Sequence, residues 1–119
     1  MKKLLLLYVD AARAHGDATE KGDHKSANRC AETLGTLYKQ ICESGEPGAQ
    51  ALRSLMSHRD QSVRYWAAYH CLPYAPLEVE ATLAEIAKGR GTLVSFSAQI
   101  TVEQWRRGGL RIGDKQSGL

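Results

Sequence analysis

The 119-residue chain has few of the residues from which metal sites and covalent cross-links are built. Its three cysteines form no Cys-x-x-Cys spacing, and its four histidines form no His-x-x-x-His or His-Glu-x-x-His spacing. Zinc sites need three or four converging nitrogen or sulfur ligands, so we expect no metal and no cofactor. Three cysteines without paired spacing also do not suggest a disulfide framework. We therefore expect the protein to reside in a reducing compartment.

The chain also lacks catalytic motifs. Glu78 and Glu80 are two residues apart, which places their side chains on different faces of a helix. Ser57 and His58 are adjacent in sequence, and adjacency alone does not orient a base toward a nucleophile. The segment 89–92, Gly-Arg-Gly-Thr, is a candidate phosphate-binding segment at a helix start. However, it lacks the Gly-Lys-Ser/Thr signature and a preceding strand. We interpret it as a turn between helices, and we expect no catalytic residues and no enzymatic activity.

Long hydrophobic runs are missing as well. The run Leu4–Val9 has six apolar residues and is ended by Asp10, which puts it at or below the lower limit of about seven for the apolar part of a signal peptide. Arg13 adds a further charge, and the residues up to His15 continue a helical pattern. We therefore expect the first residues to be a helix of the mature protein, no membrane segment and a cytoplasmic location.

Excess charge is confined to one end of the chain. The formal net charge is +3. All of it comes from the charged residues that follow Trp105, which are Arg106, Arg107, Arg111, Asp114 and Lys115. Residues 1–105 are therefore neutral overall, whereas nucleic-acid binding usually needs a basic face. We predict one helical domain over residues 1–108 and a basic, flexible tail over residues 109–119.

The most informative feature that is present is an internal repeat with an offset of 31 residues. The segment 51–56 aligns with 82–87, and 63–67 aligns with 94–98. The paired apolar positions are Leu52/Leu83, Leu55/Ile86, Val63/Val94, Tyr65/Phe96, Ala67/Ala98 and Cys71/Val102. A period of this length with two helical patterns in each unit is typical of stacked helical repeats. Such arrays bind partners on extended surfaces, so the repeat favours a binding module.

Six helices are predicted from the spacing of apolar residues and from residues that typically begin or end a helix. Their expected ranges are about 3–15, 24–44, 47–56, 61–72, 77–88 and 92–107. Asp23 and Asp60 are N-cap candidates, and Gly45 is placed to stop the second helix. Arg64 lies four residues after Asp60, where the two side chains can pair. No strand-like alternation of useful length competes, so the fold class is all-α.

The segment 60–68, Asp-Gln-Ser-Val-Arg-Tyr-Trp-Ala-Ala, resembles the second helix of a HEAT repeat, in which Asp-x-x-Val-Arg-x-x-Ala-Ala is common. Further matching residues are Gly22-Asp23, Ala27-Asn28, Ile86-Ala87, Ala98 and Trp105-Arg106-Arg107-Gly108. Residues 4–108 are thus similar to a family of short bacterial proteins of unknown function (catalogue number two-zero-one-nine). The resemblance implies a short HEAT-like repeat of about six helices in three antiparallel pairs, and it implies no activity. In the second unit, Gly91 and Ser95 replace the Asp and Arg of the pattern.

A candidate binding surface follows from comparing the two repeat units. On one arc of the fourth and sixth predicted helices, Trp66 pairs with Ser97 and His70 pairs with Thr101, so apolar character is not kept. We interpret this arc as the exposed concave face and predict that its four residues bind a partner. Trp66 is the expected aromatic anchor. The alternative is that Trp66 covers the core beneath the first helix pair.

Together these features predict a non-enzymatic protein-binding module whose partner is another protein. One setting for such a module is a bacterial immunity protein that occludes a cognate toxin. The alternatives are a general adaptor or scaffold with a cellular partner, and a HEAT-like repeat that binds nucleic acid. The near-neutral body argues against the nucleic-acid alternative.

Overall fold

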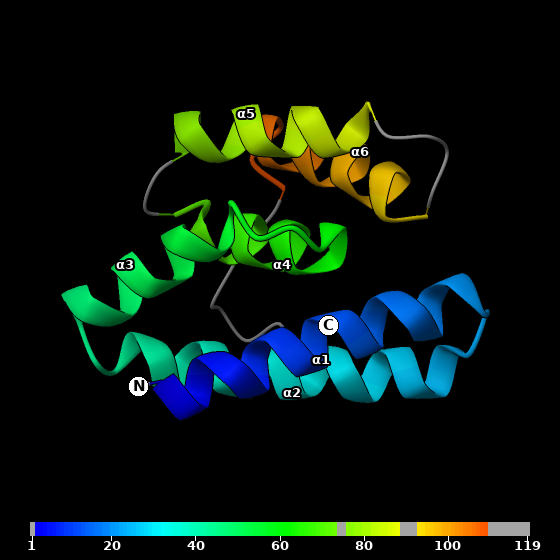
Figure 1. Ribbon diagram of the computed structural model, residues 1–119. Helices are drawn as coiled ribbons and strands as arrows, with labels where there is room; N and C mark the ends of the chain where they lie inside the picture. The colour runs from blue at the N-terminus through cyan, green and yellow to red at the C-terminus, as the bar shows by residue number, and fades with distance from the viewer. Residues whose placement is uncertain (1, 74–75, 89–92, 110–119) are drawn as a thin grey trace.

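The computed structural model of the chain describes residues 2–73, 76–88 and 93–109 (Figure 1). Its helices are α1 (Lys2–Glu20), α2 (His24–Cys42), α3 (Glu46–Leu55), α4 (Gln61–Cys71), α5 (Pro76–Ala87) and α6 (Leu93–Arg106). The described ranges contain no strand, which confirms the all-α prediction. The predicted turn at 89–92, the side chain of Phe96 and the tail from residue 110 onward lie outside the described part.

The helices form three antiparallel pairs, α1/α2, α3/α4 and α5/α6 (Figure 1). Helix α4 lies at the centre and packs against α1, α3, α5 and α6, while α1 also contacts α6. The extents of the molecule along its three principal axes are similar, at 35, 31 and 30 Å. The first and third pairs therefore meet beside α4. Among the helices described, none combines the length and the apolar content that a membrane crossing requires.

The predicted end signals position α2 and α4. The carboxylate of Asp23 accepts a hydrogen bond from the Ser26 backbone N–H at 3.2 Å. At α4, Asp60 Oδ1 accepts from the backbone N–H groups of Ser62 and Val63 at 2.9 and 3.1 Å. Both carboxylates thus satisfy N–H groups that have no partner within the helix. Gly45, with a φ of 73° in the left-handed region that favours glycine, lies three residues after the end of α2 and immediately before α3.

Arg64 does not pair with Asp60, so this prediction is wrong. The Arg64 guanidinium instead donates to the backbone carbonyls of His58 and Arg59 at 3.2 and 3.3 Å. The second carboxylate oxygen of Asp60 faces Arg13 of α1 at 3.8 Å. Arg64 therefore stabilises the turn before α4, while Asp60 connects α4 to α1.

Helix α1 is longer than predicted, because it continues past His15 through Gly16 to Glu20. Gly16 is buried against α4, and a Cβ atom at this position would overlap the side chain of Ser62. The glycine thus permits a close approach of two helices rather than ending one. The additional helical turn places Thr19 on the face of α1 that points toward α4 and α6.

One continuous core joins the three pairs, and it contains the predicted repeat stripe. Val63, Ala67 and Cys71 of α4 are fully buried, as are Leu52 of α3 and Ala98 of α6. The three cysteines of the chain are free. Small residues at the helix contacts, alanines above all, let the central helix touch four neighbours. The apolar period therefore located the core correctly.

Candidate functional site

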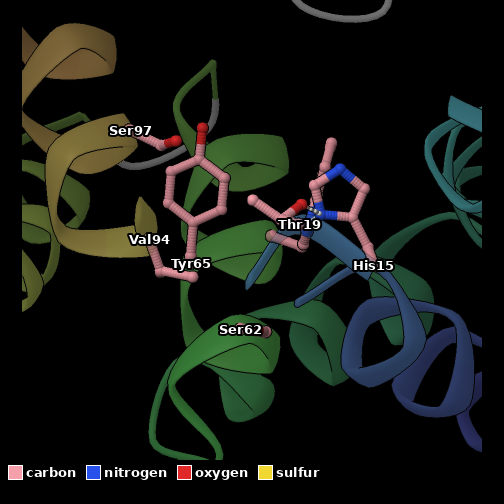
Figure 2. A pocket seen from close by; sticks show the side chains of 7 residues that line it. His15, Thr19, Ser62, Tyr65, Val94 and Ser97 are labelled. Carbon is pink, nitrogen blue, oxygen red and sulfur yellow. Dashed lines mark hydrogen bonds between the residues drawn. The ribbon is translucent and has the colours of Figure 1, made fainter. Parts of the chain in front are cut away.

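A hollow lies where α1, α4 and α6 meet. It is lined by His15, Thr19, Ser62, Tyr65, Trp66, Val94 and Ser97. Figure 2 shows His15 and Thr19 on one side of the hollow, with Tyr65, Val94 and Ser97 on the other. Its volume is about 20 Å³, which is enough for one water molecule. Three helices that are distant in sequence thus contribute hydroxyl, imidazole and aromatic groups to one small recess.

A contact between His15 and Trp66 forms the α1–α4 side of this hollow. The indole Nε1–H of Trp66 donates to His15 Nδ1 at 3.4 Å. Because an indole N–H is only a donor, His15 Nδ1 must accept, and the neutral ring carries its proton on Nε2. The two ring centroids are 5.0 Å apart and the rings are nearly perpendicular, at 81°. Burial lowers the pKa of His15 below its ordinary value, which keeps the ring neutral near pH 7.

Other aromatic rings hold Trp66 in place. The rings of Tyr65 and Tyr69 meet the Trp66 ring edge-to-face, with centroid distances of 5.6 and 5.5 Å. Trp66 is half-buried against the core and also lines the hollow. The structure therefore supports the alternative that Trp66 covers the core beneath the first helix pair, while leaving part of its surface accessible.

The prediction that His70 is exposed is wrong, since only 4% of its surface is accessible. The hydroxyl of Tyr8 on α1 lies 2.6 Å from His70 Nδ1, and the ring of Tyr38 stacks on the imidazole at 4.3 Å. Burial lowers the pKa of His70 to about 3 and raises the pKa of Tyr8 well above its ordinary value. His70 and Tyr8 are therefore a neutral pair. Helix α1 packs over this face of α4, which is why the face is not open to solvent.

The predicted exposure of Thr101 is also wrong, because 5% of its surface is accessible. Its hydroxyl lies 2.9 Å from the hydroxyl of Tyr65. A polar side chain can occupy a core when another side chain satisfies its hydrogen bond. Loss of apolar character between repeat units was therefore not a sign of exposure. The other two predicted residues, Trp66 and Ser97, are half-buried and both line the hollow.

The sequence prediction of the site missed five lining residues, His15, Thr19, Ser62, Tyr65 and Val94. Tyr65 and Val94 were predicted only as paired apolar positions of the repeat. His15 and Thr19 are four residues apart, a spacing that places them on one helix face, and the Thr19 hydroxyl lies 3.5 Å from His15 Nδ1. This signal was hidden because the first helix was predicted to end at His15. Ser62 had no signal in the sequence, since its place in the hollow depends on how closely α1 approaches α4.

In the described ranges, no three His, Cys, Asp or Glu side chains converge as metal ligands would. Comparisons with family models, with curated proteins and with solved structures found no match for this chain. The resemblance to the bacterial family of unknown function therefore stays a prediction.

Proposed function

We propose that this protein is a non-enzymatic binding module that docks another protein on the surface around the hollow between α1, α4 and α6. The observation that carries this proposal is the way Trp66 is held. His15 and two tyrosine rings fix the indole, while part of it lines an open recess. A tryptophan fixed before binding loses little conformational freedom when a partner docks, and tryptophan is enriched among the residues that dominate interface energies.

The size of the hollow supports a protein partner. Pockets that hold small-molecule ligands have volumes of roughly 300–1,000 Å³, whereas this hollow has about 20 Å³. It is sized for a water molecule or the tip of one small side chain from a partner. The hydroxyls of Thr19, Ser62 and Ser97 supply hydrogen-bond donors and acceptors there.

As the biological setting we propose toxin immunity, in which the module occludes a cognate bacterial toxin. The support is the near-neutral charge of residues 1–105 and the resemblance to a bacterial family. A general adaptor is the alternative, and the two differ in gene neighbourhood. A toxin gene beside this gene favours immunity, whereas an unrelated operon favours the adaptor. A steep dependence of DNA affinity on salt would instead indicate nucleic-acid binding.

The docking surface is tested by Ser97→Arg, which introduces a long cation at the rim of the hollow. The matched control is Gln104→Arg, at an exposed position of the same helix. A partner is first identified from native lysate, purified, and titrated against each variant by calorimetry. We expect Ser97→Arg to weaken binding at least tenfold and Gln104→Arg to leave it unchanged. Melting by circular dichroism checks that both variants are folded, and equal affinities for the two would place the docking surface elsewhere.

A further inference from the structure

We propose that the His15–Trp66 contact is an acid-sensitive switch, in which protonation of His15 releases the Trp66 indole from α1. The switch itself needs no partner. Its consequence, that acid alters docking around the hollow, rests on the proposed function. The contact joins two helices at the rim of the hollow, so a change in it alters the surface that a partner would meet.

The first step is the loss of an acceptor. Trp66 Nε1–H has His15 Nδ1 as its acceptor, at 3.4 Å, and Nδ1 accepts only while the imidazole is neutral. A protonated imidazole carries a hydrogen on both nitrogens, so two N–H groups would then face each other. The N–H edge of the indole is also the positive edge of the ring. Repulsion therefore replaces attraction when His15 is charged.

The second step is that protonated His15 keeps a partner. The Thr19 hydroxyl lies 3.5 Å from the same Nδ1 atom, one turn further along α1. A hydroxyl can donate to a neutral imidazole or accept from a protonated one. Thr19 thus supports both states of His15, whereas Trp66 supports only the neutral state. Acid is therefore expected to move the indole rather than the histidine.

The third step concerns the surrounding groups. Burial is the cause of the lowered pKa of His15, and no charged group contributes to it. On α1, Arg13 and Asp17 are two residues from His15 in the sequence and are exposed. The titratable side chains of α4 in ring contact with Trp66 are Tyr65, Tyr69 and His70. Helix α6 presents the uncharged Val94 and Ser97 to the hollow. Arg13 faces Asp60, and burial raises the pKa of both tyrosines. Among the side chains described, His15 is therefore the neighbour of Trp66 that gains a charge first as the pH falls below about 6.5.

A second link between the same helices limits the movement. The Tyr8–His70 pair also joins α1 to α4, and the pKa of His70 is about 3. Between the two protonation steps, Trp66 is released while α1 stays docked on α4. The switch therefore changes a local surface without unfolding the protein.

The test follows the indole N–H signal of Trp66 by ¹H–¹⁵N NMR from pH 7.5 to 4.5. The chain has two tryptophans, so Trp105→Phe leaves Trp66 as the single indole. We expect one titration with a midpoint below about 6.5. His15→Asn supplies an amide oxygen in place of Nδ1, and its Trp66 signal should not titrate. The control His24→Asn removes an exposed histidine and should leave the titration unchanged.

A Trp66 signal that stays constant across this range, or one that still titrates in His15→Asn, would overturn the switch. These outcomes are separate from the docking test. If Trp66 titrates but Ser97→Arg does not weaken the partner, the switch stands and the proposed docking surface fails. If Ser97→Arg blocks the partner and the Trp66 signal is flat, the docking surface stands and the switch fails.

Discussion

Two histidines join α1 to α4, and they differ in their access to water. His70 is almost fully buried between Tyr8 and Tyr38. His15 is half-buried at the rim of the hollow, in contact with Trp66. Both rings are neutral near pH 7 because burial lowers their pKa values. The deeper ring resists protonation until about pH 3, whereas the shallower ring takes up a proton under milder acid.

The depth of burial, rather than the residue type, thus determines what each histidine contributes. A sealed pair such as Tyr8–His70 strengthens the packing of two helices, because each partner satisfies the other away from water. A rim contact such as His15–Trp66 can be broken at small cost, because water can replace the lost partner. The Tyr8–His70 pair is therefore suited to stabilising the fold, and the His15–Trp66 contact to responding to a change in pH.

The comparison predicts that truncating the two histidines has unequal effects on folding. His70→Ala leaves a cavity and an unpaired Tyr8 hydroxyl, so we expect it to lower the free energy of unfolding by about 3–5 kcal/mol. His15→Ala removes the two long hydrogen bonds of His15 Nδ1, to Trp66 and to Thr19, at a site that water reaches. We expect a loss of about 1 kcal/mol. Urea titrations of both variants measure the difference. Equal losses would mean that the two sites do not differ as described.

Acid should weaken the fold mainly through the sealed site. Because the pKa of His70 is about 3 when folded and near 6.5 when unfolded, the unfolded chain binds a proton first as the pH falls. Stability is therefore lost from pH 6.5 downward, by roughly 3 kcal/mol at pH 4.5. Urea titrations at pH 7.5 and 4.5 give this change. His70→Asn should show a much smaller fall, and an unchanged fall would assign the acid sensitivity to other groups.

The smallest effect is expected at Gly16, where α1 and α4 come closest. Gly16→Ala forces the Ser62 side chain to move, at a cost of about 1–3 kcal/mol. The better helix propensity of alanine returns about 1 kcal/mol, so the net loss is about 1 kcal/mol. In a Ser62→Gly background the overlap disappears, and the same change should become stabilising. Thermal melts of the four proteins test this reversal of sign, and its absence would show that Gly16 has room for a side chain.

The sequence predicted the helices and the core well, because both depend on local signals. The N-caps Asp23 and Asp60 bind backbone N–H groups only two or three residues away, and the apolar period repeats within each helix. The candidate site was predicted in part. Trp66 and Ser97 share the hollow, whereas His70 and Thr101 are buried. The hydrogen-bond partners of His70 and Thr101, which are Tyr8 and Tyr65, are 62 and 36 residues away in the sequence. No local sequence pattern predicts hydrogen bonds over such separations.

Local signals in the sequence predicted that this protein is all-α, roughly where its helices lie apart from the end of α1, and which stripe of α4 is buried. Propensity, capping and apolar period act over a few residues, so they can be read along the chain. The placement of α1 against α4 and α6 depends instead on how the helices pack together. That packing sealed His70, left His15 and Trp66 at the rim of a hollow, and made Gly16 a point of contact. The access of water to each polar side chain depends on which helix covers it, and that is a property of the assembled fold.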